Sequence, residues 1–583
     1  MHKKTIIDFK ELGRRLIFSQ PIKELKTREL AEVRAILQEV EDWQKKGFYA
    51  VGYVSYEAAP AFEEKLQVHK APLLGEYLIY FTIHDRADEA PFPLAYDEVE
   101  MPAQWQSLTT EQEYEKAIGT IHHHIRQGDT YQVNYTVQLG AELNPQDSWA
   151  IYNRLVVEQN AAYNAYVEHD NQAVLSISPE LFFEEHRGEL TTRPMKGTTN
   201  RGLTVAADLE QADWLRQDPK NRAENMMIVD LLRNDMNRIS EIGSERVEQL
   251  CQVEQYSTVW QMTSTIKSQL RPEIGLGEIF DALFPCGSIT GAPKISTMAI
   301  IKATEKAARG VYCGTVGICL PDQRRIFNVA IRTIQLEGKK AIYGVGGGIT
   351  IQSDAADEYR ECQTKAAFLT APPDFALIET LRVADGVPQH LDAHLARLAN
   401  SAASFGLPCD KDAVRMAVMA RCAGANSTHR LKITLPRDGT PQLDLAPLDP
   451  IARDVLVLEH PEALPDRDPL RRHKTTHRAH LDRIWQAATA RGAFDALLYN
   501  QSGYLLEGAR SSVFLQIDGA WHTPPLALDI LPGIARARLL ANPALIGATH
   551  IAETRLTRAD VARADTLLLT NSLRGILTAR RIA

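Results

Sequence analysis

The proline pair at positions 372 and 373 constrains the fold of this chain more than any other feature. Proline resists both helix propagation and strand pairing, so the helix expected over residues 354–369 ends there and a new domain begins. The composition changes at the same point, because lysine is frequent before it and occurs after it only at positions 411, 432 and 474. A chain of 583 residues is also too long for one ordinary core. We therefore expect residues 1–370 and 374–583 to form separate domains.

The overall composition is that of an ordinary globular protein. Hydrophobic residues make up 44%, charged residues 24%, and the formal net charge is −9, so a nucleic-acid partner is not expected. The seven cysteines are scattered without a CxxC pair, which argues against a disulfide framework and a structural zinc site. The chain shows no apolar signal core and no uncharged run long enough to span a bilayer, so we expect a cytoplasmic protein with no membrane contact.

The first domain is expected to mix helices and strands. Hydrophobic periodicity predicts helices over residues 112–127 and 205–233. Alternating or continuous apolar runs predict strands over 173–177, 181–185, 326–334 and 341–345. Residues 1–107 are strand-rich and carry no reactive cluster, so we expect them to form a framework for a catalytic part over 108–370. The fold class is therefore α/β or α+β.

Three glutamates of this domain are candidate metal ligands. Carboxylates are the hard oxygen donors that Mg²⁺ prefers, and Glu358 and Glu361 share one face if their segment is helical. Glu224 opens a separate predicted helix that could converge on the same ion. A solvated helix face remains the alternative for an isolated ExxE pattern.

An arginine and a glycine run are candidates for binding an anion. Arg332 lies in the apolar stretch FNVAIRT, where an unpaired guanidinium would be costly to bury, so a carboxylate partner is expected. The run YGVGGGIT contains Gly346, Gly347 and Gly348, whose backbone N–H groups could form an anion-binding nest. It lacks the spacing of a dinucleotide site.

Seven sequence blocks in order carry a family resemblance. They are GDTYQVNYT (128–136), SPELFF (178–183), TRPMKGT (192–198), RAENMMIVDLLRND (222–235), FPCGSITGAPK (284–294), FNVAIRT (327–333) and SDAADEYRECQTK (353–365). From about residue 110 to 368 the chain resembles the chorismate-utilising enzymes, which include anthranilate, isochorismate and aminodeoxychorismate synthases. The resemblance implies an anthranilate synthase-like fold, Mg²⁺ as cofactor, and chorismate, a dicarboxylate, as substrate for Arg332 and the glycines.

The resemblance also implies residue roles. Glu224 and Glu361 match the direct metal ligands, with Glu358 close by. Lys196 stands where aminodeoxychorismate synthases have lysine and anthranilate synthases have alanine, so it is expected to attack the ring as a nucleophile. Glu180 matches the general acid that protonates the departing 4-hydroxyl. Because nothing in the chain resembles a glutamine amidotransferase, a separate glutaminase subunit is the expected source of ammonia.

The second domain carries its own ordered blocks. They are LIETLR (377–382), LDAHLARLANSAASFG (391–406), RLKITLPRDG (430–439), RRHKTTHRAHLDR (471–483), LLYNQSGYLLEGARSSVF (497–514), LPGIARARLL (531–540) and TLLLTNSLRGI (566–576). They resemble fold-type IV pyridoxal-phosphate enzymes, which include D-amino-acid aminotransferase and aminodeoxychorismate lyase. Of the three lysines here, elimination leaves Lys474 as the Schiff-base lysine and proton-abstracting base.

The second resemblance implies the remaining pyridoxal-phosphate contacts. Glu507 matches the acid that pairs with the pyridinium nitrogen. The phosphate would be bound by Arg397, by the backbone N–H groups of Ile534 and Ala535, and by Asn571 with Ser572. Ser512 replaces a common asparagine, and Ala535 a common threonine.

Together the two resemblances imply p-aminobenzoate formation: amination of chorismate to aminodeoxychorismate, then loss of pyruvate. Two alternatives stay open for the second domain, a general aminotransferase and a catalytically idle binding or dimerisation module, and a homodimer through this domain is compatible with the sequence. The run His122–His124 is assigned no role, because three consecutive side chains diverge around a helix.

Overall fold

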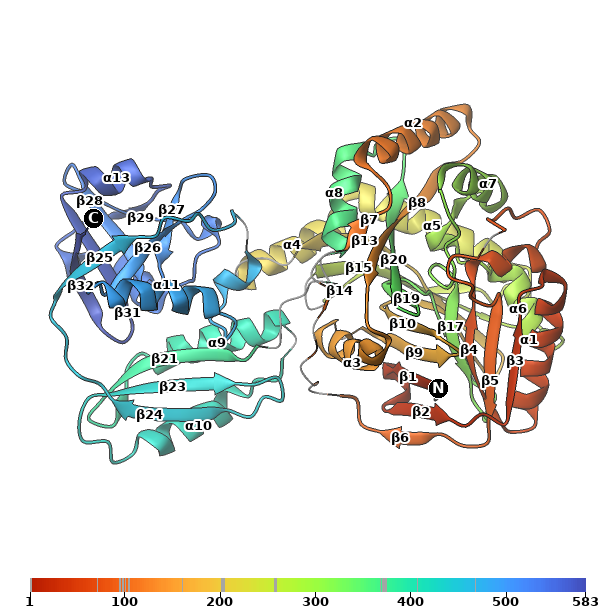
Figure 1. Ribbon diagram of the computed structural model, residues 1–583, viewed down its shortest axis with the longest axis horizontal. Coiled ribbons are helices and arrows are strands. Elements are labelled where there is room, and N and C mark those ends of the chain that lie inside the picture. The colour runs from red at the N-terminus through yellow and green to blue at the C-terminus, as the bar shows by residue number, and fades with distance from the viewer. Residues whose placement is uncertain are drawn as a thin grey trace. The chain divides into compact units, whose positions relative to one another are not determined.

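The computed structural model describes residues 3–70, 72–93, 96, 99, 101–102, 105–159, 161–200, 205–255, 259–366, 369, 375–405, 407–466 and 468–582 (Figure 1). Its contacts divide the chain into two compact units, Met1–Asn200 with Glu210–Ala371 and Arg201–Leu209 with Pro372–Ala583. The proline pair at which we predicted the boundary lies outside the described residues. The domain limits therefore stay a prediction, and each unit is described by itself.

The first unit is built on two large antiparallel sheets. The strands of the first sheet, in spatial order, are β16 (Gly291–Ala292), β8 (Gln132–Glu142), β20 (Lys340–Ile349), β19 (Thr333–Glu337), β10 (Gln172–Ser178), β9 (Tyr163–His169), β1 (Lys4–Phe9), β2 (Arg15–Ser19) and β6 (Asp88–Ala90), and β7 (Gln106–Ser107) pairs with β8. Those of the second are β13 (Met195–Asn200), β15 (Val259–Gln269), β12 (Glu189–Arg193), β11 (Leu181–His186), β18 (Arg325–Asn328), β17 (Thr315–Cys319), β4 (Tyr49–Val54), β5 (Ile79–His84) and β3 (Lys23–Thr27), and β14 (Arg246–Gln255) pairs with β15.

Both faces of these sheets are covered. One hydrophobic cluster joins Ile7 and Val167 of the first sheet to Val51 and Ile326 of the second, so it lies between the sheets. Two other clusters lie between each sheet and its helices. The helices of this unit are α1 (Leu30–Lys45), α2 (Glu111–Gln127), α3 (Ser148–Gln159), α5 (Pro219–Asn237), α6 (Leu276–Leu283), α7 (Lys294–Thr304) and α8 (Ala355–Ala366). Helix α4 (Val205–Gln217) belongs to it only from Glu210 on. A strand such as β10 is therefore buried along its whole length, including its polar residues Gln172, Ser176 and Ser178.

The helix predictions succeed where the capping signals are clear. The helix expected at 112–127 is α2, which begins with a capping box between Thr110 and Glu113 and ends at Gly128 in a left-handed conformation. The single helix predicted over 205–233 is wrong. It is two helices, α4 and α5, separated at Asp218, whose side chain accepts a hydrogen bond from Asn221 N. Pro219 is the first residue of α5, because proline has no N–H to continue α4.

The strand predictions at 173–177, 181–185 and 341–345 are confirmed by β10, β11 and β20. The single strand predicted over 326–334 is wrong, because β18 belongs to the second sheet and β19 to the first. The chain crosses between the sheets in the intervening residues, and Arg332 adopts a φ of 50° there. Apolar residues at a crossing between two buried sheets give the same sequence pattern as one long strand.

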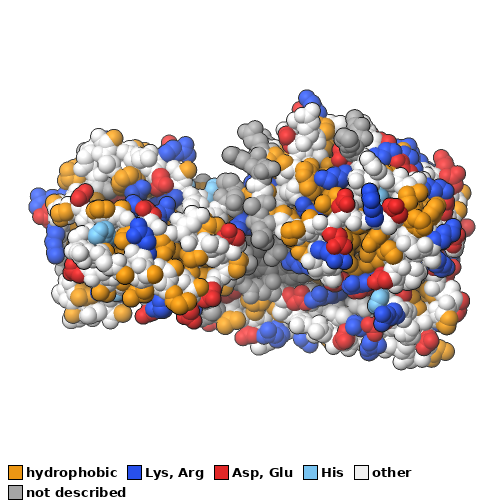
Figure 2. Space-filling view, turned by 90° about the horizontal axis from the view of Figure 1, so that it is seen from below, with side chains coloured by type: hydrophobic (Ala, Val, Ile, Leu, Met, Phe, Trp, Pro, Cys, Tyr) orange, Lys and Arg blue, Asp and Glu red, His pale blue; other side chains and the backbone are white. Residues whose placement is uncertain are grey.

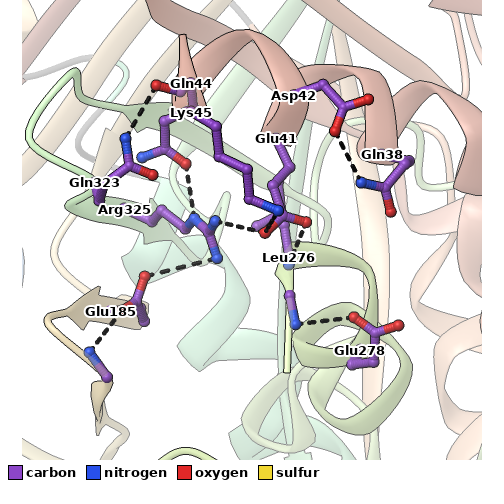
Figure 3. A network of polar contacts seen from close by, with 12 residues as sticks. Gln38, Glu41, Asp42, Gln44, Lys45, Glu185, Leu276, Glu278, Gln323 and Arg325 are labelled. Atoms are coloured by element: carbon purple, nitrogen blue, oxygen red, sulfur yellow. Dashed lines mark hydrogen bonds and ion pairs between the residues drawn. The ribbon is translucent and has the colours of Figure 1, made fainter. Parts of the chain in front are cut away.

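A buried ion-pair network fixes α1 to the second sheet (Figure 3). Arg325 of β18 donates to Oε1 of Gln44 at 2.8 Å and to Oε1 of Glu41 at 2.9 Å. The other oxygen of Glu41 accepts the backbone N–H of Leu276 at the start of α6, at 3.2 Å. Burial opposes the charge of Glu41, but Arg325 and Lys45 lower its pKa. The buried guanidinium of Arg325 therefore has hydrogen-bond and ion-pair partners, without which a buried charge would be strongly destabilising.

The second unit contains two sheets of its own. The smaller has the order β22 (Val387–Pro388), β21 (Leu377–Ala384), β23 (His429–Leu435) and β24 (Gln442–Pro447), packed with α9 (Leu391–Phe405) and α10 (Lys411–Cys422). The larger is mixed, in the order β27 (Leu505–Gly508), β26 (Asp495–Tyr499), β25 (Asp454–Glu459), β32 (Gly575–Arg581), β31 (Thr566–Asn571), β28 (Ser512–Ile517), β29 (Ala520–Thr523) and β30 (Ile551–Glu553). Helices α11 (Ala479–Ala490), α12 (Ile534–Ala541) and α13 (Arg558–Arg563) accompany it.

Acidic, basic and hydrophobic side chains are interspersed over the face of the molecule seen in Figure 2. Within the described ranges, no helix combines the length and the apolar character needed to cross a membrane.

Candidate active sites

Lys196 lies on β13, the end strand of the second sheet, beside a register shift in its pairing with β15. Its amine is 3.2 Å from the position that a Cβ atom on Gly348 would occupy. Burial lowers the pKa of Lys196, while the charges of Glu224, Glu180 and Glu361 oppose that change. The result is a lysine whose pKa is lowered although three acidic groups act on it, so a larger fraction of it is free amine than for an exposed lysine.

Glu180 lies in the short turn between β10 and β11 and is 3% exposed. Burial raises its pKa to about 7, against the opposing effect of the Ser288 hydroxyl and of Lys196. Ser288 Oγ donates to Oε1 of Glu180 at 2.7 Å. A carboxyl group that keeps its proton near neutral pH can act as a general acid.

The three predicted metal ligands come from two helices. Glu224 lies on α5, and Glu358 and Glu361 lie on α8. Burial raises the pKa of Glu224 and of Glu358, and the charge of Glu361 raises both further. Glu361 thus lies close enough to Glu224 and to Glu358 for its charge to disfavour theirs, and a divalent cation would relieve that repulsion.

The glutamates are also held by other side chains. Lys365 Nζ lies 2.7 Å from Oε1 of Glu361 and donates to Gly346 O at 2.9 Å. Ser353 Oγ donates to Oε1 of Glu358 at 2.7 Å. In the part of the chain that the structure describes, no group of three or more His, Cys, Asp or Glu side chains is arranged to hold a metal ion. The donor chemistry fits Mg²⁺, whereas the arrangement is not a formed ligand set.

The glycine run lies in β20 and is not the nest that we expected. Gly346, Gly347 and Gly348 pair in regular register with Thr136, Tyr135 and Asn134 of β8. Because glycine has no side chain, side chains from other elements approach the backbone of this strand closely. A Cβ atom on Gly347 would lie 3.2 Å from Oε2 of Glu358, and one on Gly348 would lie 2.2 Å from Nε2 of Gln132. The absent side chains therefore leave room for Lys196 and Gln132 beside Gly348, and for Glu358 beside Gly347.

Arg332 is half-buried at the crossing between the sheets. Burial raises the pKa of Tyr343 on β20, and the positive charge of Arg332 opposes that increase. The backbone oxygen of Arg332 accepts the N–H of Ile177 at 3.0 Å. The structure therefore places Arg332 next to the strand that carries the glycines, and binding of a substrate carboxylate stays a prediction.

Lys474 is half-buried in the second unit, in the segment before α11, and its backbone oxygen accepts the N–H of Ile378 of β21 at 2.8 Å. Burial lowers the pKa of Lys474 to about 7. The charge of Glu379 opposes this effect, and those of Arg397, Arg478 and Arg510 reinforce it. Near neutral pH the amine is therefore partly unprotonated, as a nucleophile or a base must be.

Arg397 of α9 is held beside this lysine by a buried carboxylate. Its Nε and Nη2 donate to the two oxygens of Glu379 at 2.8 and 2.7 Å, and Nη1 donates to Pro532 O at 3.0 Å. His394 Nδ1 lies 2.7 Å from Oε2 of Glu379. Burial would raise the pKa of Glu379, but Arg397 and His394 lower it to about 2. Glu379 thus orients the predicted phosphate-binding arginine.

Glu507 of β27 is buried, which raises its pKa to about 8, and its Oε1 accepts the N–H of Leu531 at 3.3 Å. Ile534 and Ala535 open α12 after Gly533. A Cβ atom on Gly533 would lie 2.6 Å from Oγ of Ser512, so Ser512, one of the departures noted in the sequence, borders this helix start. These features fit pyridoxal phosphate: a buried acid, an arginine that reaches the LPG turn, and a glycine that leaves room before a helix.

Asn571 is the last residue of β31 and Ser572 follows it, and Thr570 of the same strand pairs with Ser512. The side-chain oxygen of Asn571 accepts the N–H groups of Leu573 and Arg574 at 3.1 and 2.8 Å. Asn571 therefore stabilises a turn near the helix start, and its predicted contact with phosphate stays a prediction.

Three residues of these sites were missed from the sequence. Gln132 and Ser288 stand inside recognised blocks, but nothing local distinguishes their side chains. Glu379 had a signal, since an acidic residue inside the apolar strand LIETLR needs a buried partner.

Comparison with known proteins identifies the families. Residues 3–371 match the family described as chorismate binding enzyme. The chain belongs to the chorismate binding enzyme family. Residues 376–582 match the amino-transferase class IV family, which implies pyridoxal phosphate as a cofactor. The predicted fold class, an anthranilate synthase-like unit followed by a fold-type IV unit, is confirmed.

Individual relatives match the chorismate-binding part. The chain is 40% identical over 257 residues to an aminodeoxychorismate synthase of Streptomyces griseus, covering 44% of this chain and 35% of that protein. It is 37% identical over 257 residues to aminodeoxychorismate synthase component 1 of Klebsiella aerogenes, covering 44% and 57%. The anthranilate synthase component I structure from Streptococcus pneumoniae matches with a TM-score of 0.54 at 24% identity, covering 63% of this chain and 92% of that one. The matches thus span about a third to three fifths of the curated relatives.

Proposed function

We propose that this chain makes p-aminobenzoate from chorismate in two steps, one in each unit. The observation that carries the first step is the placement of Lys196, with its lowered pKa, near Glu180, whose pKa is raised to about 7. A nucleophile and an acid are thereby paired in one site. The relatives named aminodeoxychorismate synthase support the choice of reaction.

In the first site, the Lys196 amine adds to the ring of chorismate as the 4-hydroxyl leaves, and protonated Glu180 supplies the proton that makes water the leaving group. Ammonia then bonds to the 4-position and the lysine departs, so the enzyme is regenerated. Glu224 and Glu361, with Glu358 beside them, would hold Mg²⁺, which supplies positive charge for the ring carboxylate. Arg332 and the β20 strand at Gly346–Gly348 would bind the substrate.

Ammonia for this step would come from a separate glutaminase subunit. The relative from Klebsiella aerogenes is named component 1 of aminodeoxychorismate synthase, which supports a second component that supplies the ammonia.

In the second site, bound pyridoxal phosphate would supply an electron sink for the carbon next to the substrate amine. Lys474, partly unprotonated at pH 7, removes the proton from that carbon. Buried Glu507 would hold a proton at the ring nitrogen of the cofactor, and Arg397, oriented by Glu379, would bind its phosphate together with the start of α12. Loss of pyruvate then leaves the aromatic product.

One incubation tests both steps. The full chain is supplied with chorismate, ammonium, Mg²⁺ and pyridoxal phosphate, and the products are identified. We expect p-aminobenzoate and pyruvate in equal amounts. Anthranilate as the product would refute the first assignment. Amino-group exchange with a keto acid and no pyruvate would refute the second, and would indicate a general aminotransferase.

A further inference from the structure

Gln132 of β8 carries an amide group that the fold buries completely. Its side chain is 0% exposed, and among the described residues neither Nε2 nor Oε1 has a hydrogen-bond partner. Leaving a buried polar group unpaired is destabilising, because the group loses its hydrogen bonds to water and gains none in return. Two other polar side chains of β8 do have partners. Thr136 Oγ1 donates to Oε1 of Glu305 at 2.8 Å, and Gln138 Nε2 donates to Ala308 O at 2.7 Å. The unpaired amide of Gln132 therefore needs an explanation of its own.

The amide of Gln132 and the amine of Lys196 both lie beside Gly348. Nε2 of Gln132 lies 2.2 Å, and Nζ of Lys196 3.2 Å, from the position that a Cβ atom on Gly348 would occupy. No side chain stands between the two groups at that point, because residue 348 has none. Both amide atoms are closed to solvent, so a flexible protein side chain can reach them more readily than a ligand can.

We propose that Gln132 is a positioning residue for Lys196: its amide oxygen accepts one N–H of the lysine amine and so directs the amine's lone pair at the substrate ring. The inference rests on the proposed function, in which Lys196 is the nucleophile. The oxygen is the acceptor because a hydrogen bond donated to the amine would occupy the lone pair that attack requires. A half-turn of the amide exchanges its oxygen and nitrogen within the same space.

A neutral amide suits this role because of the charges around it. Glu180, Glu224 and Glu361 all favour the protonated form of Lys196, and Lys365 disfavours it. A neutral amide can orient the amine without a charge that would shift the protonation equilibrium of Lys196. A carboxylate in its place would be a further negative charge beside Lys196 and would favour the ammonium form, which cannot attack.

The test measures aminodeoxychorismate formation by the full chain at saturating Mg²⁺ and constant free ammonia. Gln132→Met keeps the length of the side chain and removes its acceptor. We expect kcat to fall about ten- to one hundred-fold with KM for chorismate unchanged. Gln132→Glu should move the acid limb of the pH profile up by about one to three pH units. Gln138→Met and Gln138→Glu are the matched controls on the same strand. In both, the acid limb of the pH profile should stay at its wild-type position.

The outcomes separate this inference from the proposed function. If Lys196→Ala is inactive while both Gln132 variants keep the wild-type kcat and pH profile, the positioning role is wrong and the nucleophile stands. If Lys196→Ala keeps full activity, the proposed function fails first. A raised KM with unchanged kcat in Gln132→Met would mean that the amide contacts the substrate, and would overturn the proposal. If Gln132→Met does not fold, the proposal is tested by Gln132→Glu alone. That variant keeps the shape of glutamine, and a pH profile equal to that of the wild type would overturn the positioning role.

Discussion

The hydroxyl of Ser288 donates a 2.7 Å hydrogen bond to Oε1 of Glu180, and both side chains are 3% exposed. Burial raises the pKa of Glu180 to about 7, and the bond from Ser288 limits that rise because it stabilises the charged form. The structure thus contains one interaction that raises the acid's pKa and one that lowers it. Their balance keeps a useful fraction of Glu180 protonated near neutral pH.

Replacing Ser288 by alanine should move the alkaline limb of synthase activity to higher pH. Protonated Glu180 is the active acid, so activity falls as pH rises through its pKa, and loss of the Ser288 bond raises that pKa. The measurement is kcat for aminodeoxychorismate formation against pH at constant free ammonia. Ser240→Ala, which removes a buried hydroxyl bonded to Met236 O and Ser268, is the control. A limb that stays in place or moves down would contradict the assigned balance.

Replacing Lys196 by alanine should abolish aminodeoxychorismate formation, because alanine has no amine to attack the ring. Product analysis by chromatography is the measurement, and anthranilate formed from ammonia is the alternative product to look for. Lys267→Ala is the control, since Lys267 lies on the neighbouring strand β15 and pairs with Glu189 and Glu248 at the surface. Unchanged p-aminobenzoate output from Lys196→Ala would exclude the covalent role.

Replacing Glu224 or Glu361 by glutamine should weaken magnesium dependence, because a neutral amide holds a divalent cation less well than a carboxylate. We expect the Mg²⁺ concentration for half-maximal activity to rise about ten- to one hundred-fold. Asp357→Asn is the control on α8, because Asp357 is exposed and pairs with Arg360. Normal magnesium titrations in both glutamine variants would refute the ligand assignment.

The sequence could propose residues for the first site, but not their surroundings. Lys196, Glu180 and the glutamates are candidates because each stands in a block with a recognisable order, and their roles stay predictions. The contact of Gln132 with Gly348 could not be predicted, because it depends on which strands become neighbours, and β8 and β20 are far apart in the chain. The glycine run was expected to be a nest, since glycine permits one, but ladder pairing with β8 makes it a strand.

Two errors in secondary structure have different causes. Pro219 carried a signal for a new helix, and the hydrophobic periodicity around it concealed the break. The residues before Arg332 carried no such signal, because a crossing between two buried sheets is as apolar as a strand. In the second unit, Lys474 followed from elimination, whereas the bonds of Glu379 to Arg397 and His394 join two elements and needed the fold.

Replacing Lys474 by alanine should leave the first step intact and stop the second. All the predicted synthase residues precede position 372 and none requires pyridoxal phosphate, so aminodeoxychorismate should accumulate while p-aminobenzoate and pyruvate do not appear. The near-ultraviolet to visible absorbance of the bound cofactor should change as well, because the amine whose pKa burial lowers to about 7 is gone. Lys411→Ala, an exposed lysine at the start of α10, is the control and should keep both activities. Pyruvate release at the wild-type rate by Lys474→Ala would show that another group is the base, and loss of chorismate consumption would show that the two steps depend on each other.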